Sequence, residues 1–161
     1  MLRWGMPTPP KFVKGKADSG VTNIRNVSSP HWRRWLGVEN RCVVPATSFS
    51  EYGSVRDPDT GKLPLYWFAL SREQPLFFFA GIWGTWHGVR KVKEGGLDHE
   101  LFGFLTCEPN GIVAPIHQKA MPAILTSQDQ VERWLTAPAS EALRLQRPLP
   151  DSELVILQNA A

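Results

Sequence analysis

Cysteine is scarce in this sequence: the 161 residues include only two, Cys42 and Cys107, which lie far apart and form no CxxC pair. A disulfide framework and a cysteine-based zinc site are therefore not expected, and the composition is typical of a reducing compartment. No apolar run reaches the roughly 18 residues that a membrane-spanning helix needs. The opening residues, MLRWGMPTPP, lack the hydrophobic region of a secretory signal. We expect a cytoplasmic protein with no membrane partner.

Several well-known catalytic and binding motifs are also missing. The chain has four scattered histidines, His31, His87, His99 and His117. With no HExxH motif and no Cys/His cluster, the sequence predicts no metal site and no cofactor. It has no GxGxxG, GxxxxGKS/T or GxSxG segment, so nucleotide binding and a hydrolase nucleophile elbow lack support. A cysteine protease that pairs Cys42 or Cys107 with His117 stays open, although the apolar run around Cys42 is typical of an inert buried thiol.

Acidic residues are rare at the start of the chain and common at its end. Residues 1–41 hold two acids against eight Lys or Arg, whereas residues 98–161 hold eight acids against four basic residues. This asymmetry predicts a basic face that attracts polyanions, with a solvated basic face without a partner as the alternative. Seven Trp and eight Phe suit both a hydrophobic core and platforms on which bases stack.

The apolar pattern predicts short strands with a few short helices. Residues 76–86, LFFFAGIWGTW, are almost wholly apolar and should form a central strand. Pro45 should lie at a sheet edge or a bulge. Residues 87–100 are expected to form an exposed loop. Further strands are expected at 2–6, 41–46, 47–52, 65–70, 101–109 and 153–158, and helices at 29–37 and 127–137.

These elements predict the fold class. No alternation of strand and helix typical of βαβ units is visible, and no internal repeat is present. We expect one α+β domain over residues 1–161, with a mixed, mostly antiparallel, barrel-like sheet and short peripheral helices. The chain opens inside an expected strand, which suggests that the beginning of the domain is missing.

Polar residues at the ends of apolar runs are the candidates for chemistry. Glu51 ends the segment RCVVPATSFSEY, His117 lies in IVAPIHQKAMP, and Asn23, Arg25 and Thr106 stand beside other apolar runs. Each alone is most simply a solvated or hydrogen-bonded structural residue. Together a carboxylate, an imidazole, an amide and a guanidinium would supply acid/base catalysis, orientation and anion binding.

Five segments, in this order, resemble the SOS response-associated peptidase (SRAP) family. They span roughly residues 2–125, and each corresponds to a motif of that family. The segments are LRWGMPTPP, TNIRNV, RCVVPATSFSEY, FFFAGIW and FLTCEPNGIVAPIHQKAMPAIL. The resemblance implies the SRAP fold and a protein of the SOS DNA-damage response, associated at most with the bacterial nucleoid.

The resemblance also implies a substrate and a reaction. Family members recognise abasic sites in single-stranded DNA, and a cysteine exposed by removal of the initiator Met forms a Schiff base and then a thiazolidine crosslink. By position, Glu51 would be the acid/base group for imine formation and N-terminal autoproteolysis, His117 a proton shuttle at the sugar, and Asn23 the residue that orients the nucleophile. DNA binding would fall to Arg25, Thr106, Trp4 and Lys119.

The chain departs from the family pattern at decisive positions. Residue 2 is Leu, so the reactive cysteine is absent, and neither Cys42 nor Cys107 offers an α-amine beside its thiol. Tyr52 stands where Trp is usual, and Lys119 replaces the usual Arg, with one extra residue before the Met-Pro pair. We expect either an internal start within a longer protein or a shortened, phage-like relative, which would form no thiazolidine. The α-amine of Met1 could still support weak strand cleavage.

Two other hypotheses remain. One is a non-catalytic single-stranded DNA-binding protein that uses its basic N-terminal third and exposed aromatic residues such as Trp32 and Trp35, with an affinity that falls strongly with salt. The other is a fragment whose exposed sheet edge pairs with a second copy or with a missing segment.

Overall fold

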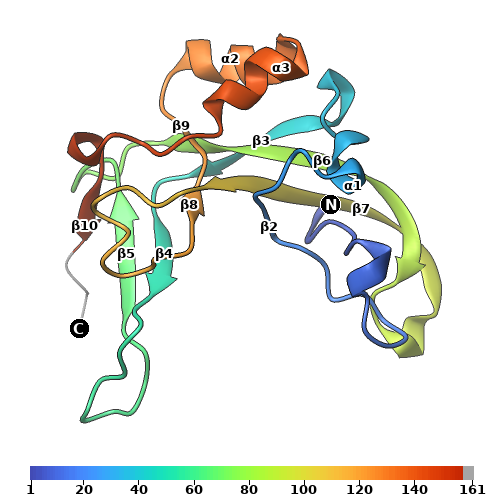
Figure 1. Ribbon diagram of the computed structural model, residues 1–161, viewed down its shortest axis with the longest axis horizontal. Helices are drawn as coiled ribbons and strands as arrows, with labels where there is room; N and C mark the ends of the chain where they lie inside the picture. The colour runs from blue at the N-terminus through green and yellow to red at the C-terminus, as the bar shows by residue number, and fades with distance from the viewer. Residues whose placement is uncertain (158–161) are drawn as a thin grey trace.

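The computed structural model describes residues 1–157. Its main sheet is built on the antiparallel hairpin of β6 (Phe77–Val89) and β7 (Gly96–Cys107) (Figure 1). The central position of β6 follows from its apolar first half, which is buried from both faces. Five shorter strands complete the seven-stranded sheet: β1 (Arg3–Trp4), β2 (Asn23–Ile24) and β8 (Met121–Pro122) pair with β7, and β3 (Arg41–Ala46) and β9 (Ile124–Leu125) pair with β6.

The strand directions are mixed. β1 and β2 run parallel to β7, and the other pairings are antiparallel. β3 ends the strand order β1-β7-β6-β3. Pro45 therefore lies in an edge strand, as predicted, where its missing N–H removes no ladder bond toward a further strand.

A second, three-stranded sheet carries part of the candidate site. It has β5 (Leu65–Ala69) in the middle, with β4 (Phe49–Tyr52) and β10 (Val155–Leu157) antiparallel on either side. The strand expected over residues 153–158 therefore forms in part, and Gln158 lies outside the described residues.

The helices are short and lie at the periphery. The α-helices are α1 (Pro30–Arg33), α2 (Gln128–Thr136) and α3 (Ala139–Ala142), and the 3-10 helices are η1 (Pro10–Phe12), η2 (Val38–Asn40), η3 (Val92–Glu94), η4 (Leu143–Leu145) and η5 (Asp151–Glu153). Ser127 caps α2 as its sequence suggests, because its side-chain oxygen accepts a hydrogen bond from the backbone N–H of Gln130. In the described part of the chain, none of these helices has the length and apolar character to cross a membrane.

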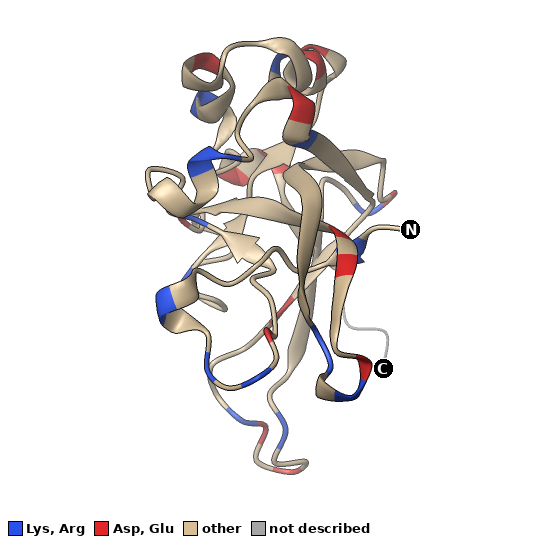
Figure 2. Cartoon of the chain, turned by 90° about the vertical axis from the view of Figure 1, so that its right-hand side faces the viewer, with Lys and Arg blue, Asp and Glu red and all other residues tan. Residues whose placement is uncertain are grey.

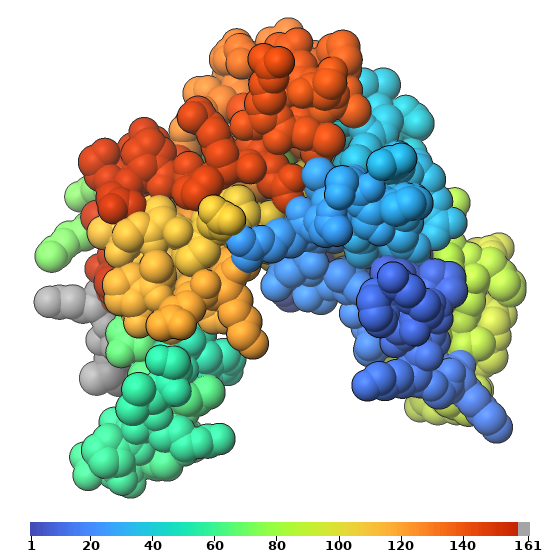
Figure 3. Space-filling model, in the orientation of Figure 1, coloured from blue at the N-terminus to red at the C-terminus, as the bar shows by residue number. Residues whose placement is uncertain are grey.

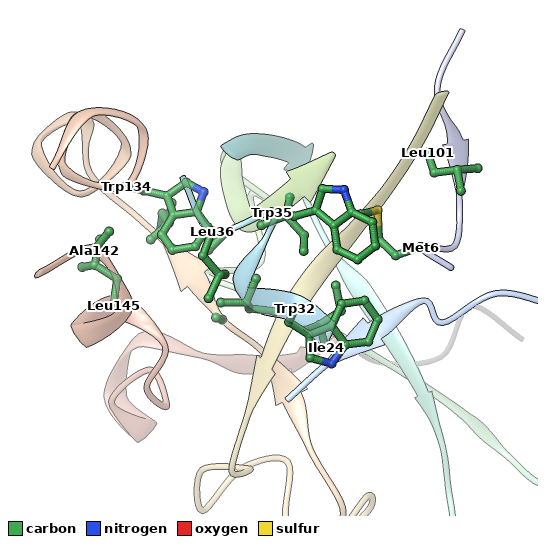
Figure 4. Packing of buried hydrophobic residues seen from close by; sticks show 14 residues of the cluster. Met6, Ile24, Trp32, Trp35, Leu36, Leu101, Trp134, Ala142 and Leu145 are labelled. Atoms are coloured by element: carbon green, nitrogen blue, oxygen red, sulfur yellow. The ribbon is translucent and has the colours of Figure 1, made fainter. Parts of the chain in front are cut away.

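The core consists of two apolar clusters. One packs the main sheet against the helices and includes Trp32, Trp35 and Trp134 (Figure 4). The indole N–H of Trp134 donates to the carbonyl oxygen of Cys42 at 2.8 Å, which fixes α2 on β3. The second cluster lies between the main sheet and the smaller one and includes Phe49, Phe68, Phe77 and Phe79.

The expected α+β class with mixed, mostly antiparallel strands and short peripheral helices is confirmed, but the strands of residues 1–157 do not close into a barrel. The exposed loop expected over residues 87–100 is wrong for residues 87–89 and 96–100, which are strand, and right for residues 91–95. The hairpin continues through this region, with His87 opposite Asp98 and Val89 opposite Gly96. The sequence of this extension lacks the alternation of apolar and polar residues typical of a strand, because neither of its faces packs on an apolar core.

Candidate functional site

Glu51 and His117 lie side by side in the structure. His117 Nδ1 is 3.6 Å from Glu51 Oε2, and the side chains are 30% and 25% exposed. Burial raises the pKa of the Glu51 carboxyl, and the facing imidazole of His117 opposes this change. The pair therefore has the contact, the partial burial and the solvent access that an acid/base pair needs.

The backbone holds each member of the pair. Glu51 lies in β4 opposite Tyr66 of β5. His117 ends a turn in which its backbone N–H donates to the carbonyl oxygen of Val113 at 2.8 Å. The buried Asn110 fixes that turn, because its Oδ1 accepts from the backbone N–H of Val113 at 3.0 Å and its Nδ2 donates to the carbonyl oxygen of Leu149. Sequence reasoning missed Asn110, although a polar residue after Glu-Pro and before an apolar turn was a usable signal.

Arg25 and Thr106 share a pocket of about 240 Å³. The Arg25 guanidinium donates to the carbonyl oxygen of Lys119, and its Nη2 lies 3.5 Å from Glu108 Oε1. Arg25 therefore links the end of β2 to the segment that follows His117. The pocket is lined by Arg25, Thr106, Cys107, Glu108, Gln146, Arg147 and Pro148.

Asn23 and Trp4 lie on the same side of the sheet as this pocket. Asn23 is opposite Phe104 in the pairing of β2 with β7. Thr106, which lines the pocket, follows Phe104 by two residues, and side chains two residues apart along a strand share a face. Asn23 is exposed, and within residues 1–157 its side chain forms no hydrogen bond with Glu51 or His117. Trp4 is 52% exposed and stacks on Phe104 with ring centroids 5.5 Å apart.

Lys119 enters this arrangement through its backbone. Its carbonyl oxygen accepts the hydrogen bond from Arg25, and its side chain is exposed. The ammonium group forms no ion pair or hydrogen bond with the described residues, and its expected role in DNA binding stays a prediction.

The molecule is hollowed on the side where these residues gather. Figure 3 shows a wide notch between the arm that carries β4 and β5 and the arm formed by the N-terminal residues. β4, with Glu51, belongs to one arm, and β2, with Asn23, crosses the base of the notch (Figures 1 and 3).

The basic residues of the chain do not form one compact patch. Figure 2 shows Lys and Arg segments at the top, along the left-hand edge and in the lower loops, with acidic segments among them. Arg25 and Arg147 are the two arginines that line the pocket described above. The basic residues therefore occur in several separate places, with acidic residues among them.

Two of the aromatic residues expected at the surface are buried. Trp32 is 6% and Trp35 7% exposed, so the expectation that they offer platforms for bases is wrong. Their spacing around α1 turns both indoles into the helix-side core, where they contact His31 and each other. The exposed aromatic residues near the site include Trp4 and Tyr52, which is 59% exposed and follows Glu51 in β4.

The two thiols are poor nucleophiles. Burial raises the pKa of both Cys42 and Cys107 to about 11, so each thiol is protonated near neutral pH. Cys107 Sγ donates toward the carbonyl oxygen of Met121, and within residues 1–157 neither sulfur forms a hydrogen bond with His117. The cysteine-protease alternative therefore lacks an activated thiol. Within residues 1–157, no three His, Cys, Asp or Glu side chains are grouped so that they could hold a metal ion.

Comparisons with known proteins identify relatives of this chain. The chain is 34% identical over 137 residues to abasic site processing protein YoqW of Bacillus subtilis (strain 168), an alignment that covers 83% of this chain and 55% of YoqW. It is 27% identical over 172 residues to abasic site processing protein HMCES of Gallus gallus, covering 91% of this chain and 48% of HMCES. The chain thus spans about half the length of the curated relatives it matches.

Similarity of structure agrees with similarity of sequence. A crystal structure of a protein from Bacteroides thetaiotaomicron superposes with a TM-score of 0.65 at 28% identity, over 83% of this chain and 56% of that protein. The family described as SOS response associated peptidase (SRAP) matches residues 1–159. The chain therefore belongs to the SOS response associated peptidase family.

Proposed function

We propose that the chain recognises abasic sites in single-stranded DNA and that Glu51 and His117 move protons at the baseless sugar. The observation that carries this proposal is the half-buried Glu51–His117 contact at 3.6 Å. Arg25 donates a hydrogen bond to the carbonyl oxygen of Lys119, two residues after His117. The names of the relatives YoqW and HMCES, both called abasic site processing proteins, support the choice of substrate.

The chemistry of an abasic sugar matches an acid/base pair. Its closed form is a cyclic hemiacetal, which opens to the aldehyde when one group removes the hydroxyl proton and another protonates the ring oxygen. The raised pKa of Glu51 brings its carboxyl closer to the pH at which it can both give and take a proton. His117, in contact with it, is the second group of the pair.

The surrounding residues have the chemistry to hold the DNA. We assign a phosphate beside the lesion to Arg25, the wall of the pocket to Thr106, and orientation of the reacting groups to Asn23. Trp4, exposed and stacked on Phe104, offers a platform for a neighbouring base. The Lys119 ammonium adds positive charge beside the strand.

Covalent capture belongs to the family chemistry and requires an α-amine next to a thiol. This chain has Leu at position 2, and its cysteines, Cys42 and Cys107, are internal residues with raised pKa values. We therefore expect the 161-residue chain to bind an abasic site without forming a thiazolidine. Opening of the sugar by Glu51 and His117 does not depend on a thiol.

Denaturing electrophoresis after incubation with labelled single-stranded DNA tests the proposal. The DNA contains one abasic site, made by uracil removal, and a hydroxylamine probe reports the opened aldehyde. We expect no stable protein–DNA band, faster trapping of the aldehyde with the wild-type chain than without it, and loss of this acceleration in Glu51→Gln. A crosslinked band that survives denaturation would contradict the absence of thiazolidine chemistry.

A non-catalytic single-stranded DNA-binding protein is the second candidate, favoured by the exposed Trp4–Phe104 stack. Glu51→Gln separates the two functions, because a pure binder would show equal aldehyde trapping with both proteins. Under either function the variant should retain its DNA affinity within about twofold, since the substitution removes a negative charge and no phosphate ligand. Fluorescence anisotropy with the same DNA measures this affinity.

A further inference from the structure

The pocket beside Arg25 contains a second arginine that has no assigned role. Arg147 lines this pocket and also a smaller one of about 60 Å³ in which Glu153 takes part. Its side chain is exposed and forms no ion pair or hydrogen bond with any described residue, 1–157. Arg147 is therefore a cation that lies next to the proposed DNA site with its donors available.

The backbone around Arg147 is fastened to the two strands that carry the proposed site. Gln146 Nε2 donates to the carbonyl oxygen of Arg25 at 2.8 Å and to that of Thr106 at 2.9 Å. The N–H of Arg147 donates to the carbonyl oxygen of Leu145 at 2.9 Å, and Pro148 restricts the chain that follows. The position of Arg147 relative to Arg25 is therefore set by hydrogen bonds and does not depend on a free loop.

The charges of the pocket match one phosphodiester group. Arg25 and Arg147 supply two positive charges, and Glu108, which is 80% exposed, supplies one negative charge. The remaining single positive charge is complementary to the single negative charge of a backbone phosphate. Guanidinium groups present paired N–H donors that fit phosphate oxygens, and the Thr106 hydroxyl, which has no hydrogen bond with the described residues, can add an O–H donor.

We propose that Arg147 is a second phosphate-binding residue for single-stranded DNA, acting with Arg25 on one backbone phosphate in a pocket that neither Glu51 nor His117 lines. This inference rests on the proposed function, which supplies the DNA. Gln146 is the positioning residue of the subsite, because it ties the Arg147 segment to β2 and β7. The subsite holds the strand at a fixed distance from the acid/base pair.

Arg147→Gln tests the subsite, and Arg144→Gln is its matched control. Arg144 is exposed, lies three residues earlier, makes no ion pair among residues 1–157 and does not line the pocket, so both variants lose the same charge from the same segment. The probe is a fluorescein-labelled oligothymidylate with a central tetrahydrofuran abasic analogue, and the readout is Kd by anisotropy. We expect Arg147→Gln to raise Kd about fivefold, as for loss of one partly exposed charge pair, and Arg144→Gln to change it less than about twofold.

The outcomes distinguish failure of the Arg147 subsite from failure of the proposed function. Equal effects of Arg147→Gln and Arg144→Gln would overturn the subsite and leave the proposed function standing. A wild-type chain with no measurable affinity for the probe would overturn both. Circular dichroism melting of each variant shows that a change in Kd does not come from unfolding.

Discussion

The carboxyl of Glu51 costs more free energy to ionise than an exposed carboxyl does. Burial raises the pKa of its carboxyl, and the contact with His117 opposes that change. A carboxyl whose pKa is higher in the folded than in the unfolded chain destabilises the fold above its folded pKa. The penalty disappears as pH falls below the unfolded value. The proposed site is therefore held together at a cost to stability.

Glu51→Gln should consequently stabilise the protein near neutral pH. We expect a rise in Tm of at most about 4 °C, equivalent to about 1 kcal/mol for a chain of this size. The difference from the wild type should shrink toward about pH 4, where the carboxyl of the unfolded chain becomes protonated. Thermal melting across this pH range measures it, with Glu132→Gln, an exposed acid of α2, as the control for the change in charge. A variant that is less stable than the wild type at neutral pH would contradict the prediction.

At the scale of elements, a buried ion pair joins the N-terminal segment to the β6–β7 hairpin. Arg90 Nη1 lies 3.7 Å from Asp18 Oδ1, and both side chains are more than nine-tenths buried. Burial alone raises the pKa of the Asp18 carboxyl, but hydrogen bonds from Thr8 and Gly20, together with the Arg90 guanidinium, outweigh it and hold the pKa below its usual value. This pair fixes the segment that leads from Trp4 to β2.

Asp18→Asn should therefore destabilise the protein by about 3–5 kcal/mol, because it leaves the Arg90 charge buried without its partner. A lowered pKa gives stability that is present above the unfolded pKa and lost as pH falls through the folded pKa. The difference in the free energy of unfolding between the variant and the wild type should thus become smaller below about pH 4. Urea unfolding at several pH values provides the measurement. Asp98→Asn is the control, since its pair with His87 is exposed and should contribute less than about 1 kcal/mol.

The elements also show which parts of the fold the sequence could predict. Residues 76–86 were predictable because an almost unbroken apolar run fits a strand covered on both faces, and Ser127 marked the start of α2 by its capping side chain. The two-residue strands β1 and β2 are set by pairing with β7 rather than by their own composition. The polar end of the hairpin, residues 87–100, was missed because no core imposes a pattern on it.

The candidate site was predictable in part. Glu51 and His117 were selected from separate segments, and the structure brings them into contact, although their roles remain proposals. Arg25 and Thr106 share a pocket as a consequence of the parallel pairing of β2 with β7. The contribution of Gln146 could not be foreseen, because its two acceptors lie 121 and 40 positions away and are backbone carbonyls, which leave no pattern in the side chains.

At the scale of the whole molecule, the hydrogen bond from Arg25 to the Lys119 carbonyl joins the end of β2 to the segment that follows His117. The edges of the sheets remain available for pairing with a second copy, which stays a prediction. β4 suits that role better than β3, since Pro45 removes an N–H donor from β3.

The Arg25–Glu108 contact has a thermodynamic consequence for the whole binding reaction. A strand that reaches Arg25 displaces a carboxylate that belongs to the protein, so no dissolved anion gains translational entropy there. Affinity should then depend on ionic strength no more steeply than the roughly 0.7 logarithmic units per contacted phosphate that release of cations from single-stranded DNA gives. In Glu108→Gln a dissolved anion can bind Arg25 instead and is released when DNA binds. The plot of log Kd against the logarithm of salt concentration should therefore become steeper. An unchanged gradient would mean that Glu108 never competes with the nucleic acid.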